Sequence, residues 1–234
     1  MMDNYNLFAK RYATYAQNSA DQRTEVELGH KPVALLLGRY LNGKILDVGC
    51  GPGNFSRFIQ SCGASVVGVD VSAKEIEIAK AKNDGIEYHV IKSGELGFLP
   101  NDFDAVTFSF SLFTIPTRDE VIRTLKACRA KIKSNGKLVI LNSKFEPGEA
   151  REFVSYKIQA LPSPKSGDKV RVWLGRDRRL EVIDYYWTDK DYEEMLVESD
   201  FAIENIVEPK AVEGIGWLDE CEYSPCKIFI AAPF

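Results

Sequence analysis

Short apolar runs alternate with segments of helical periodicity between residues 44 and 142, and this alternation constrains the fold more than any other feature. Five apolar runs predict buried strands, at residues 44–48, 65–69, 86–91, 103–109 and 137–142. Helical spacing predicts a helix over 54–59 and another along the stripe of Val121, Leu125, Cys128 and Ile132. Strands that alternate with helices of this length predict a parallel sheet covered on both faces.

Two short sequences predict how further helices begin. Ser72 with Glu75, and Thr117 with Glu120, match the capping box, in which a hydroxyl and a carboxylate each bond a free backbone amide. We therefore expect helices to start directly after Ser72 and Thr117.

The pattern changes after residue 143. Alternating segments at 169–174 and 180–187 flank a turn at Gly175 and predict a β-hairpin. Thr188 is expected to cap a helix that runs to about Ser199, and strands follow at 201–207 and 227–231.

Composition excludes several classes of protein. The chain has 234 residues, 45% hydrophobic and 27% charged, with a net charge of -4, which disfavours a dedicated nucleic-acid binder. Five cysteines without a close C-x-x-C pair and two histidines argue against a zinc site or a disulfide framework. The first ten residues lack signal-peptide features, and no apolar run approaches the roughly 18 residues of a membrane span. We expect a soluble, cytoplasmic protein without a membrane partner.

A glycine-rich loop lies between the first strand and its helix. Gly49, Gly51 and Gly53 would let the backbone approach a ligand closely. Asp70 ends the second strand, where a carboxylate can accept hydrogen bonds from two ribose hydroxyls. Loop, strand order and terminal acid together predict a nucleoside site, whereas a tight turn with a capping aspartate is the purely structural alternative.

The spacing of the loop distinguishes two classes of ligand. It reads G-x-G-x-G, while a dinucleotide site reads G-x-G-x-x-G and presents a helix N-terminus to a pyrophosphate. Asp47 precedes the loop and would repel a pyrophosphate, but it could pair with an ammonium group. An amino acid joined to a nucleoside fits both observations, and a nicotinamide oxidoreductase is the alternative.

The same residues carry a resemblance to a known family. Residues 45–53 closely resemble motif I of the class I S-adenosylmethionine-dependent methyltransferases, and residues 67–72 resemble the next motif. The resemblance continues through 103–106 and 132–140, and residues 198–201 stand where the family often has Ala-Gly-Phe. It implies a doubly wound, Rossmann-like α/β sheet of seven strands with the last strand antiparallel. It also implies S-adenosylmethionine as cofactor and S-adenosylhomocysteine as product.

We divide the expected chain accordingly. A single methyltransferase domain would span residues 1–234, with N-terminal cap helices at 1–40 and the cofactor-binding core at 41–143. A β-hairpin lid would be inserted at 144–187, and residues 188–234 would complete the sheet.

The resemblance also implies which residues bind the cofactor. The glycines would face its methionyl part and Asp70 its ribose. The family commonly places an acid after strand three for the adenine amino group, but here Lys92 to Leu96 offers Ser93, a backbone carbonyl or Glu95. The expected cofactor residues are Asp47, Gly49, Cys50, Gly51, Gly53, Asp70, Val71, Ser93, Gly94, Glu95 and Ser109.

Few dedicated catalytic groups are expected. A sulfonium methyl is already electrophilic, so the enzyme must hold a nucleophile in line and exclude water. Neither His30 nor His89 follows strand four, where some relatives place a histidine, and both are expected to be structural. The metal-dependent branch needs an acid after strand four and an Asp-Asn pair after strand five, and only Asn142 is present near the latter, so we expect no metal. Tyr185 is the candidate that would orient or deprotonate the acceptor.

Aromatic residues are the candidates for binding the acceptor. Tyr12 belongs to a stripe on an expected N-terminal helix, and Tyr185 and Trp187 lie on one face of a lid strand. With Phe113 after strand four, they make up the expected substrate-binding set, although ordinary packing explains such rings as well.

The leading hypothesis is a methyltransferase that acts on N, O or C of a small molecule. Six basic residues from Lys165 to Arg179 leave open an RNA or protein methyltransferase that uses a basic lid. A catalytically silent cofactor-binding module is the third reading. The sequence does not indicate the oligomeric state.

Overall fold

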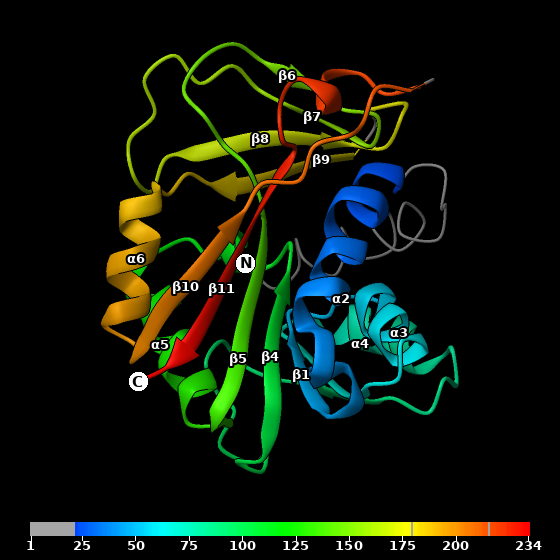
Figure 1. Cartoon of the computed structure of the whole chain (residues 1–234), viewed down its shortest axis with the longest axis vertical. Helices are drawn as coiled ribbons and strands as arrows, with labels where there is room; N and C mark the ends of the chain where they lie inside the picture. Colours follow the sequence, from blue (N-terminus) through cyan, green and yellow to red (C-terminus); the bar gives the residue numbers. More distant parts are fainter. Residues whose placement is uncertain (1–21, 179, 215) are drawn as a thin grey trace.

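The centre of the molecule is a seven-stranded sheet, whose strands run roughly vertically in Figure 1. A computed structural model describes residues 22–178, 180–214 and 216–234. The strand order is β10-β11-β5-β4-β1-β2-β3. The bounds are β1 Lys44–Val48, β2 Ser65–Asp70, β3 Glu87–Val90, β4 Phe103–Ser109, β5 Ile132–Ser143, β10 Phe201–Val207 and β11 Cys226–Pro233.

The expected reversal of the last strand is confirmed. β11 pairs antiparallel with both β5 and β10, whereas β1, β2, β3, β4 and β5 form parallel pairs. The chain winds outward from β1 to β3 and then crosses back to β4 on the other side of β1. The carboxyl ends of β1 and β4 therefore frame the switch point at which open α/β sheets bind ligands.

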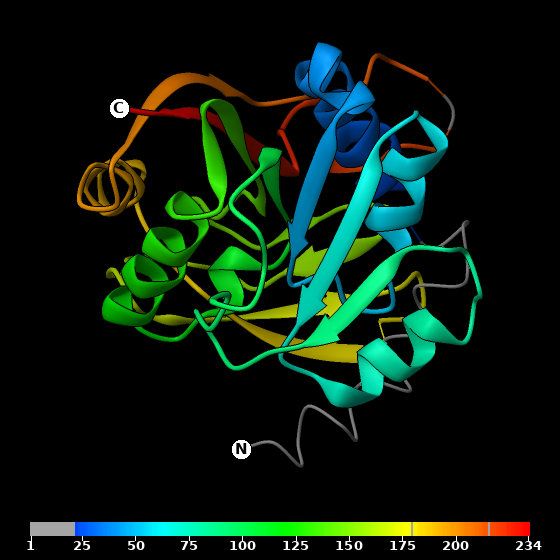
Figure 2. The same ribbon diagram turned by 90° about the horizontal axis from the view of Figure 1, so that it is seen from below.

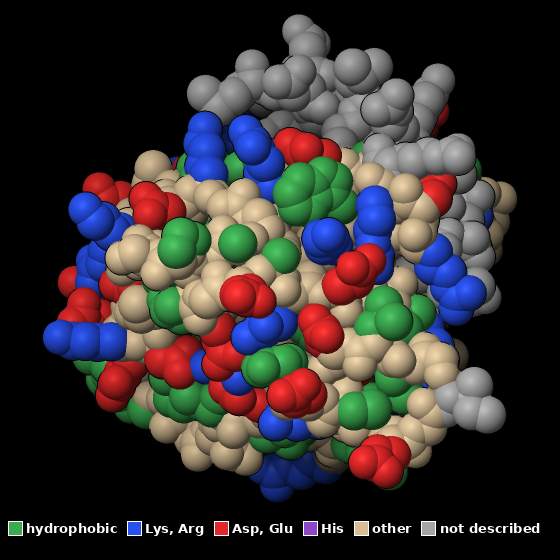
Figure 3. Space-filling model, turned by 90° about the horizontal axis from the view of Figure 1, so that it is seen from above, with side chains coloured by type: hydrophobic (Ala, Val, Ile, Leu, Met, Phe, Trp, Pro, Cys, Tyr) green, Lys and Arg blue, Asp and Glu red, His purple; other side chains and the backbone are tan. Residues whose placement is uncertain are grey.

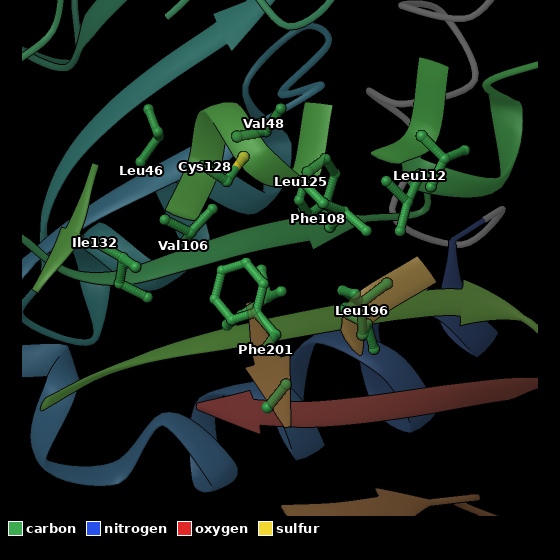
Figure 4. Close-up of a cluster of buried hydrophobic side chains, with 14 of the residues drawn as sticks. Leu46, Val48, Val106, Phe108, Leu112, Leu125, Cys128, Ile132, Leu196 and Phe201 are labelled. Carbon is green, nitrogen blue, oxygen red and sulfur yellow. The ribbon is translucent and has the colours of Figure 1, made fainter. Parts of the chain in front are cut away.

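Helices cover both faces of the sheet (Figures 1 and 2). Alternation along the strands separates the two cores, because Leu46 and Val48 pack with α5 and α6 while Ile45 packs with α2 and α3. Figure 4 shows the first core, in which Leu125 and Cys128 of α5 lie over Val106 and Phe108. The helical elements are η1 Glu25–His30, α2 Lys31–Leu37, η2 Gly38–Asn42, α3 Asn54–Ser61, α4 Ala73–Lys80, η3 Leu112–Thr114, α5 Arg118–Arg129, α6 Asp189–Val197 and η4 Asp219–Cys221.

A second, antiparallel sheet lies over the carboxyl ends of the parallel strands (Figure 1). Its order is β6-β7-β8-β9, and we call these four strands the lid sheet. The hairpin of β8 (Lys169–Leu174) and β9 (Leu180–Tyr185) is confirmed. Sequence reasoning missed β6 (Arg151–Glu152) and β7 (Tyr156–Ile158), because strands of two and three residues are too short to show a period.

Two local predictions were wrong. β5 begins at Ile132 rather than after Gly136, and its register against β4 shifts between Phe103 and Ala105, so the Asn-Gly pair bends a strand instead of preceding it. Ser72 and Thr117 do cap their helices, but the reciprocal half of the predicted capping box is found only at Thr188 and Asp191 among the described helices.

Candidate active site

A cavity of about 680 Å³ opens between the carboxyl ends of the parallel strands and the lid sheet. Two groups of residues line much of the cavity. The cofactor wall comprises Gly49 to Gly51, Asp70 to Ser72, Glu75, Ser93 and Gly94. The lid wall comprises Tyr156, Val172, Leu174 and Glu181 to Tyr185.

The glycine loop turns sharply at the end of β1. Gly49 and Gly51 have φ angles of +73° and +52°, the left-handed region that favours glycine. A Cβ on Gly49 would lie 2.4 Å from Cβ of Ser111, so the loop has no room for a side chain there. The amides of Gly49 and Cys50 both donate to the carbonyl of Val69, at 2.8 and 3.0 Å, which fixes the loop against β2.

Asp70 lies at the end of β2, as predicted, and its carboxylate is preorganised by backbone amides. Gly51 N donates to one oxygen and Ser72 N to the other, each at 2.8 Å. Burial raises the pKa of this carboxyl, and these amide donors oppose the rise. Asp70 lines the cavity, and each of its oxygens keeps a lone pair that can accept a further hydrogen bond, for example from a vicinal diol.

Asp47 does not reach the cavity. Its side chain is fully buried and accepts hydrogen bonds from Ser56 Oγ at 2.6 Å and Thr107 Oγ1 at 3.2 Å. Burial raises its pKa to about 6. The expected pairing with an ammonium group of the ligand is therefore not supported, and Asp47 joins β1 to α3 and β4 instead.

Glu75 takes a position that the sequence analysis did not foresee. Ser72 N donates to Asp70 rather than to Glu75, so the carboxyl of Glu75 is left out of the predicted capping box. It lines the cavity, and its buried Oε2 has no hydrogen-bond partner among the described residues. Burial and the neighbouring charge of Asp70 raise its pKa to about 8.

The loop after β3 supplies part of the predicted set. Ser93 and Gly94 line the cavity, and Ser93 Oγ lies 3.4 Å from Thr124 Oγ1 of α5. Glu95 lies outside the cavity lining, with its carboxylate 3.8 Å from Lys92 Nζ. Cys50, Val71 and Ser109 line the cavity, whereas Gly53 precedes α3 outside it.

His30 also lines the cavity, from the end of η1. Its Nε2 lies 3.3 Å from Ser109 Oγ, and its ring contacts Phe55 and Phe58. Burial lowers its pKa to about 4, so the imidazole is neutral at physiological pH. A base this weak is poorly matched to proton abstraction.

The predicted acceptor residues separate in the structure. Phe113 and Tyr185 line the cavity. Trp187 lies at a separate small hollow with Lys144, Asp189 and Lys227, and packs against the core under α6. Tyr12 lies outside the described residues.

Two further features of the lid wall were missed. Tyr156 donates its hydroxyl to the carbonyl of Pro225, and Asp184 is a buried acid on β9. Asp184 carried a signal in the sequence, because an acid stands in the buried row of Leu180 and Val182. Tyr156 carried none, because β7 itself was not predicted.

Two negative findings apply to the described ranges. No helix there is long and apolar enough to cross a membrane. In the same ranges, no group of three or more His, Cys, Asp and Glu side chains is arranged to hold a metal ion.

Comparisons with known proteins agree with this geometry. Residues 45–136 match the model of a methyltransferase domain family. The chain is 27% identical over 165 residues to a demethylmenaquinone methyltransferase from Renibacterium salmoninarum, which covers 64% of this chain and 68% of that protein. It is 32% identical over 127 residues to a ubiquinone biosynthesis O-methyltransferase from Dechloromonas aromatica, and spans about half of that relative (53%).

Solved structures share the fold over nearly the whole chain. An S-adenosylmethionine-dependent methyltransferase from Clostridium acetobutylicum superposes with a TM-score of 0.66 at 17% identity, covering 95% of this chain and 98% of that one. An amino pentose methyltransferase from Micromonospora echinaspora, solved with S-adenosylmethionine bound, gives 0.66 at 18% identity, covering 92% and 96%. The fold is thus that of a Rossmann-like methyltransferase. Together these findings support a class I S-adenosylmethionine-dependent methyltransferase, with S-adenosylmethionine as its cofactor.

Proposed function

We propose that this protein transfers the methyl group of S-adenosylmethionine to a small molecule held beneath the lid sheet. The observation that carries the proposal is that one cavity joins the cofactor wall to a mostly apolar lid wall. The named quinone methyltransferases among its relatives act on small molecules, which supports the same class of acceptor here.

The cofactor wall supplies a contact for each part of the ligand. Asp70 would accept from the ribose hydroxyls, since two amides already hold its carboxylate in place. The left-handed loop at Gly49 and Gly51 would accommodate the methionyl part. Glu75 and Ser93, which line the cavity, would contact the adenine in place of the acid that the family commonly has after β3.

The ligand supplies the chemistry through its electrophilic sulfonium methyl. The protein's own residues orient the acceptor and exclude water, tasks that suit the buried rings of Phe113 and Tyr156. The Tyr185 hydroxyl remains our candidate for orienting the acceptor, because Tyr185 borders the same cavity.

The basic run offers little support for an RNA acceptor. Arg178 donates to the carbonyl of Gly175 at 2.8 Å and lies 3.5 Å from Glu152, and Arg171 lies 3.6 Å from Glu181. Figure 3, which views the molecule from the lid side, shows basic and acidic side chains interspersed there. An RNA backbone would favour a continuous positive surface.

Methyl transfer from radiolabelled S-adenosylmethionine into a cell extract of the source organism tests the proposal. The extract is separated into small-molecule, RNA and protein fractions, and the Asp70→Ala variant is the inactive control. We expect label in the small-molecule fraction with the wild-type protein alone. Label in the RNA or protein fraction would instead indicate an RNA or protein methyltransferase. Absence of label from every fraction would favour a catalytically silent cofactor-binding module.

A further inference from the structure

Asp184 is the feature of the lid wall that packing does not explain. It is 4% exposed, and its neighbour across β8 is Val170. No hydrogen bond or ion pair to its carboxyl is found among the described residues, and Asp184 lines the cavity. An unpartnered buried carboxyl is costly, so such groups are rare unless a ligand or water completes them.

The other acids nearby already have partners or belong to the cofactor wall. Asp70 is held by two amides. Glu181, three residues earlier on β9, accepts a hydrogen bond from Trp173 Nε1 at 3.1 Å, and its carboxylate lies 3.6 Å from Arg171. Asp184 is therefore the acid of the lid wall that is available to a second ligand.

The charge around the cavity indicates what that ligand is. The described lining residues include five carboxylic acids and no lysine or arginine: Glu25, Asp70, Glu75, Glu181 and Asp184. His30 adds no positive charge, because burial lowers its pKa to about 4. A bound cation favours the ionised form of nearby acids, so acids without a basic partner suit a cationic ligand. The sulfonium cofactor accounts for the acids of the cofactor wall, but Asp184 lies on the opposite wall.

We infer that the methyl acceptor is an amine, and that Asp184 binds its ammonium form and removes the proton that blocks the nucleophilic nitrogen. The inference rests on the proposed small-molecule methyl transfer and adds the chemical class of the acceptor.

The reaction balances with the groups present. The ammonium R-NH3+ gives one proton to the Asp184 carboxylate and becomes R-NH2. The nitrogen lone pair then forms the N–CH3 bond while the S–CH3 bond breaks, and its electron pair stays on sulfur as the neutral thioether. The product leaves as R-NH2+-CH3, and Asp184 releases its proton to water.

An amine fits this cavity better than a hydroxyl does. Deprotonating a phenol would place a second negative charge among the acids, whereas deprotonating an ammonium leaves a neutral nitrogen. Burial holds the pKa of Asp184 well above its usual range, which brings it closer to the value of about 10 typical of an amine. Proton transfer between groups of similar pKa is efficient.

The test uses wild-type protein, Asp184→Asn and Glu193→Gln with radiolabelled S-adenosylmethionine and the small-molecule fraction of the extract. Glu193 is an exposed acid of α6 and serves as the matched control for loss of a carboxylate. Half of each fraction is first treated with succinimidyl acetate and then hydroxylamine, which leaves amines blocked as amides and hydroxyls free. Affinity for S-adenosylhomocysteine is measured by calorimetry for every variant.

We expect acetylation to abolish labelling by the wild type. We expect Asp184→Asn to lower transfer by roughly 100-fold or more, with the affinity for S-adenosylhomocysteine within about threefold of wild type. Glu193→Gln should transfer as the wild type does. Label that survives acetylation would overturn the amine while the proposed function stands. Transfer by Asp184→Asn within threefold of wild type would overturn the role of Asp184. Failure to label the untreated fraction would instead overturn the proposed function itself.

Discussion

The acids Asp70 and Asp184, one on each wall of the cavity, are held in opposite ways. On the cofactor wall, Asp70 and the amides of Gly49 and Cys50 all have protein partners before a ligand arrives. On the lid wall, Asp184 is buried without one, beside the apolar side chains of Val172 and Val182. A prebuilt wall suits a ligand shared by a whole family, because binding then costs little reorganisation. The lid wall leaves a polar group for the acceptor to complete, so the two walls should respond differently to substitution.

The largest effect on binding is expected at the prebuilt wall. Asp70→Ala should weaken S-adenosylmethionine by about 2 to 4 kcal/mol, since hydrogen bonds to a charged group contribute roughly 1.5 to 3 each and are not additive. The substitution also leaves the amides of Gly51 and Ser72 without their acceptor. Titration calorimetry with S-adenosylhomocysteine measures the change.

Asp70→Asn separates the contribution of the negative charge to cofactor affinity from that of the side chain's shape, in the same experiment. It keeps one acceptor oxygen, so its loss of affinity should fall between those of wild type and Asp70→Ala. An affinity unchanged in both variants would show that the ribose binds elsewhere.

A side chain in the glycine loop should both lower the stability of the protein and weaken cofactor binding. Gly49→Ala forces a side chain into a φ of +73° and 2.4 Å from Cβ of Ser111. Left-handed strain of roughly 1 to 2 kcal/mol and the steric overlap should lower the free energy of unfolding by about 2 to 3 kcal/mol. Urea unfolding of the cofactor-free protein tests this value.

A second substitution, at Ser111, separates the contribution of steric overlap to this loss of stability from that of backbone strain. The double variant Gly49→Ala/Ser111→Gly has no Cβ at residue 111, so the steric overlap disappears while the backbone strain at residue 49 remains. It should therefore be more stable than the double variant Gly49→Ala/Ser111→Ala, which keeps that Cβ. Equal stability of the two double variants would show that contact with Ser111 contributes nothing.

Glu75 makes the stability of the cofactor-free protein depend on pH. Its carboxyl has a pKa of about 8 in the folded protein and about 4.5 when unfolded, so the folded state holds the proton more tightly. This contribution to stability is fully present below pH 4.5 and is lost as the pH rises to about 8. Glu75→Gln should remove that loss, making the cofactor-free variant more stable than wild type at pH 8.5 by on the order of 1 to 3 kcal/mol.

Urea unfolding at pH 5 and pH 8.5 measures the difference, with Glu77→Gln as control. Glu77 lies on the same helix but is exposed and pairs with Lys74 at 2.6 Å. If wild type and Glu75→Gln lose stability in parallel between the two pH values, the raised pKa of Glu75 is wrong.

The parts of the molecule that were predictable are those with a repeating local pattern. The apolar runs located all seven strands of the main sheet, and the family resemblance gave the direction of β11. The charge of Asp47 beside the glycine loop predicted a contact with the ligand, but it could not reveal that Ser56 and Thr107, on two other elements, bind that carboxyl. Glu75 was misassigned for a similar reason, because the capping pattern is local and the competition from Asp70 is not.

The smallest effect on transfer is expected at Trp187, which lies near the lid wall in sequence but away from it in space. Trp187 borders the small hollow beside Lys227 and packs against the core, whereas Phe113 is 3% exposed and lines the cavity. Trp187→Phe should leave transfer within about threefold and cost roughly 1 kcal/mol of stability, because a large, partly buried ring is replaced by a smaller one. Phe113→Leu, a truncation of a similar kind inside the cavity, should lower transfer more than Trp187→Phe does at equal affinity for S-adenosylhomocysteine. Initial rates on the identified acceptor, with thermal midpoints of both variants, test the pair. If instead Trp187→Phe lost more than tenfold in transfer and Phe113→Leu lost little, the acceptor would contact Trp187, as the sequence analysis expected.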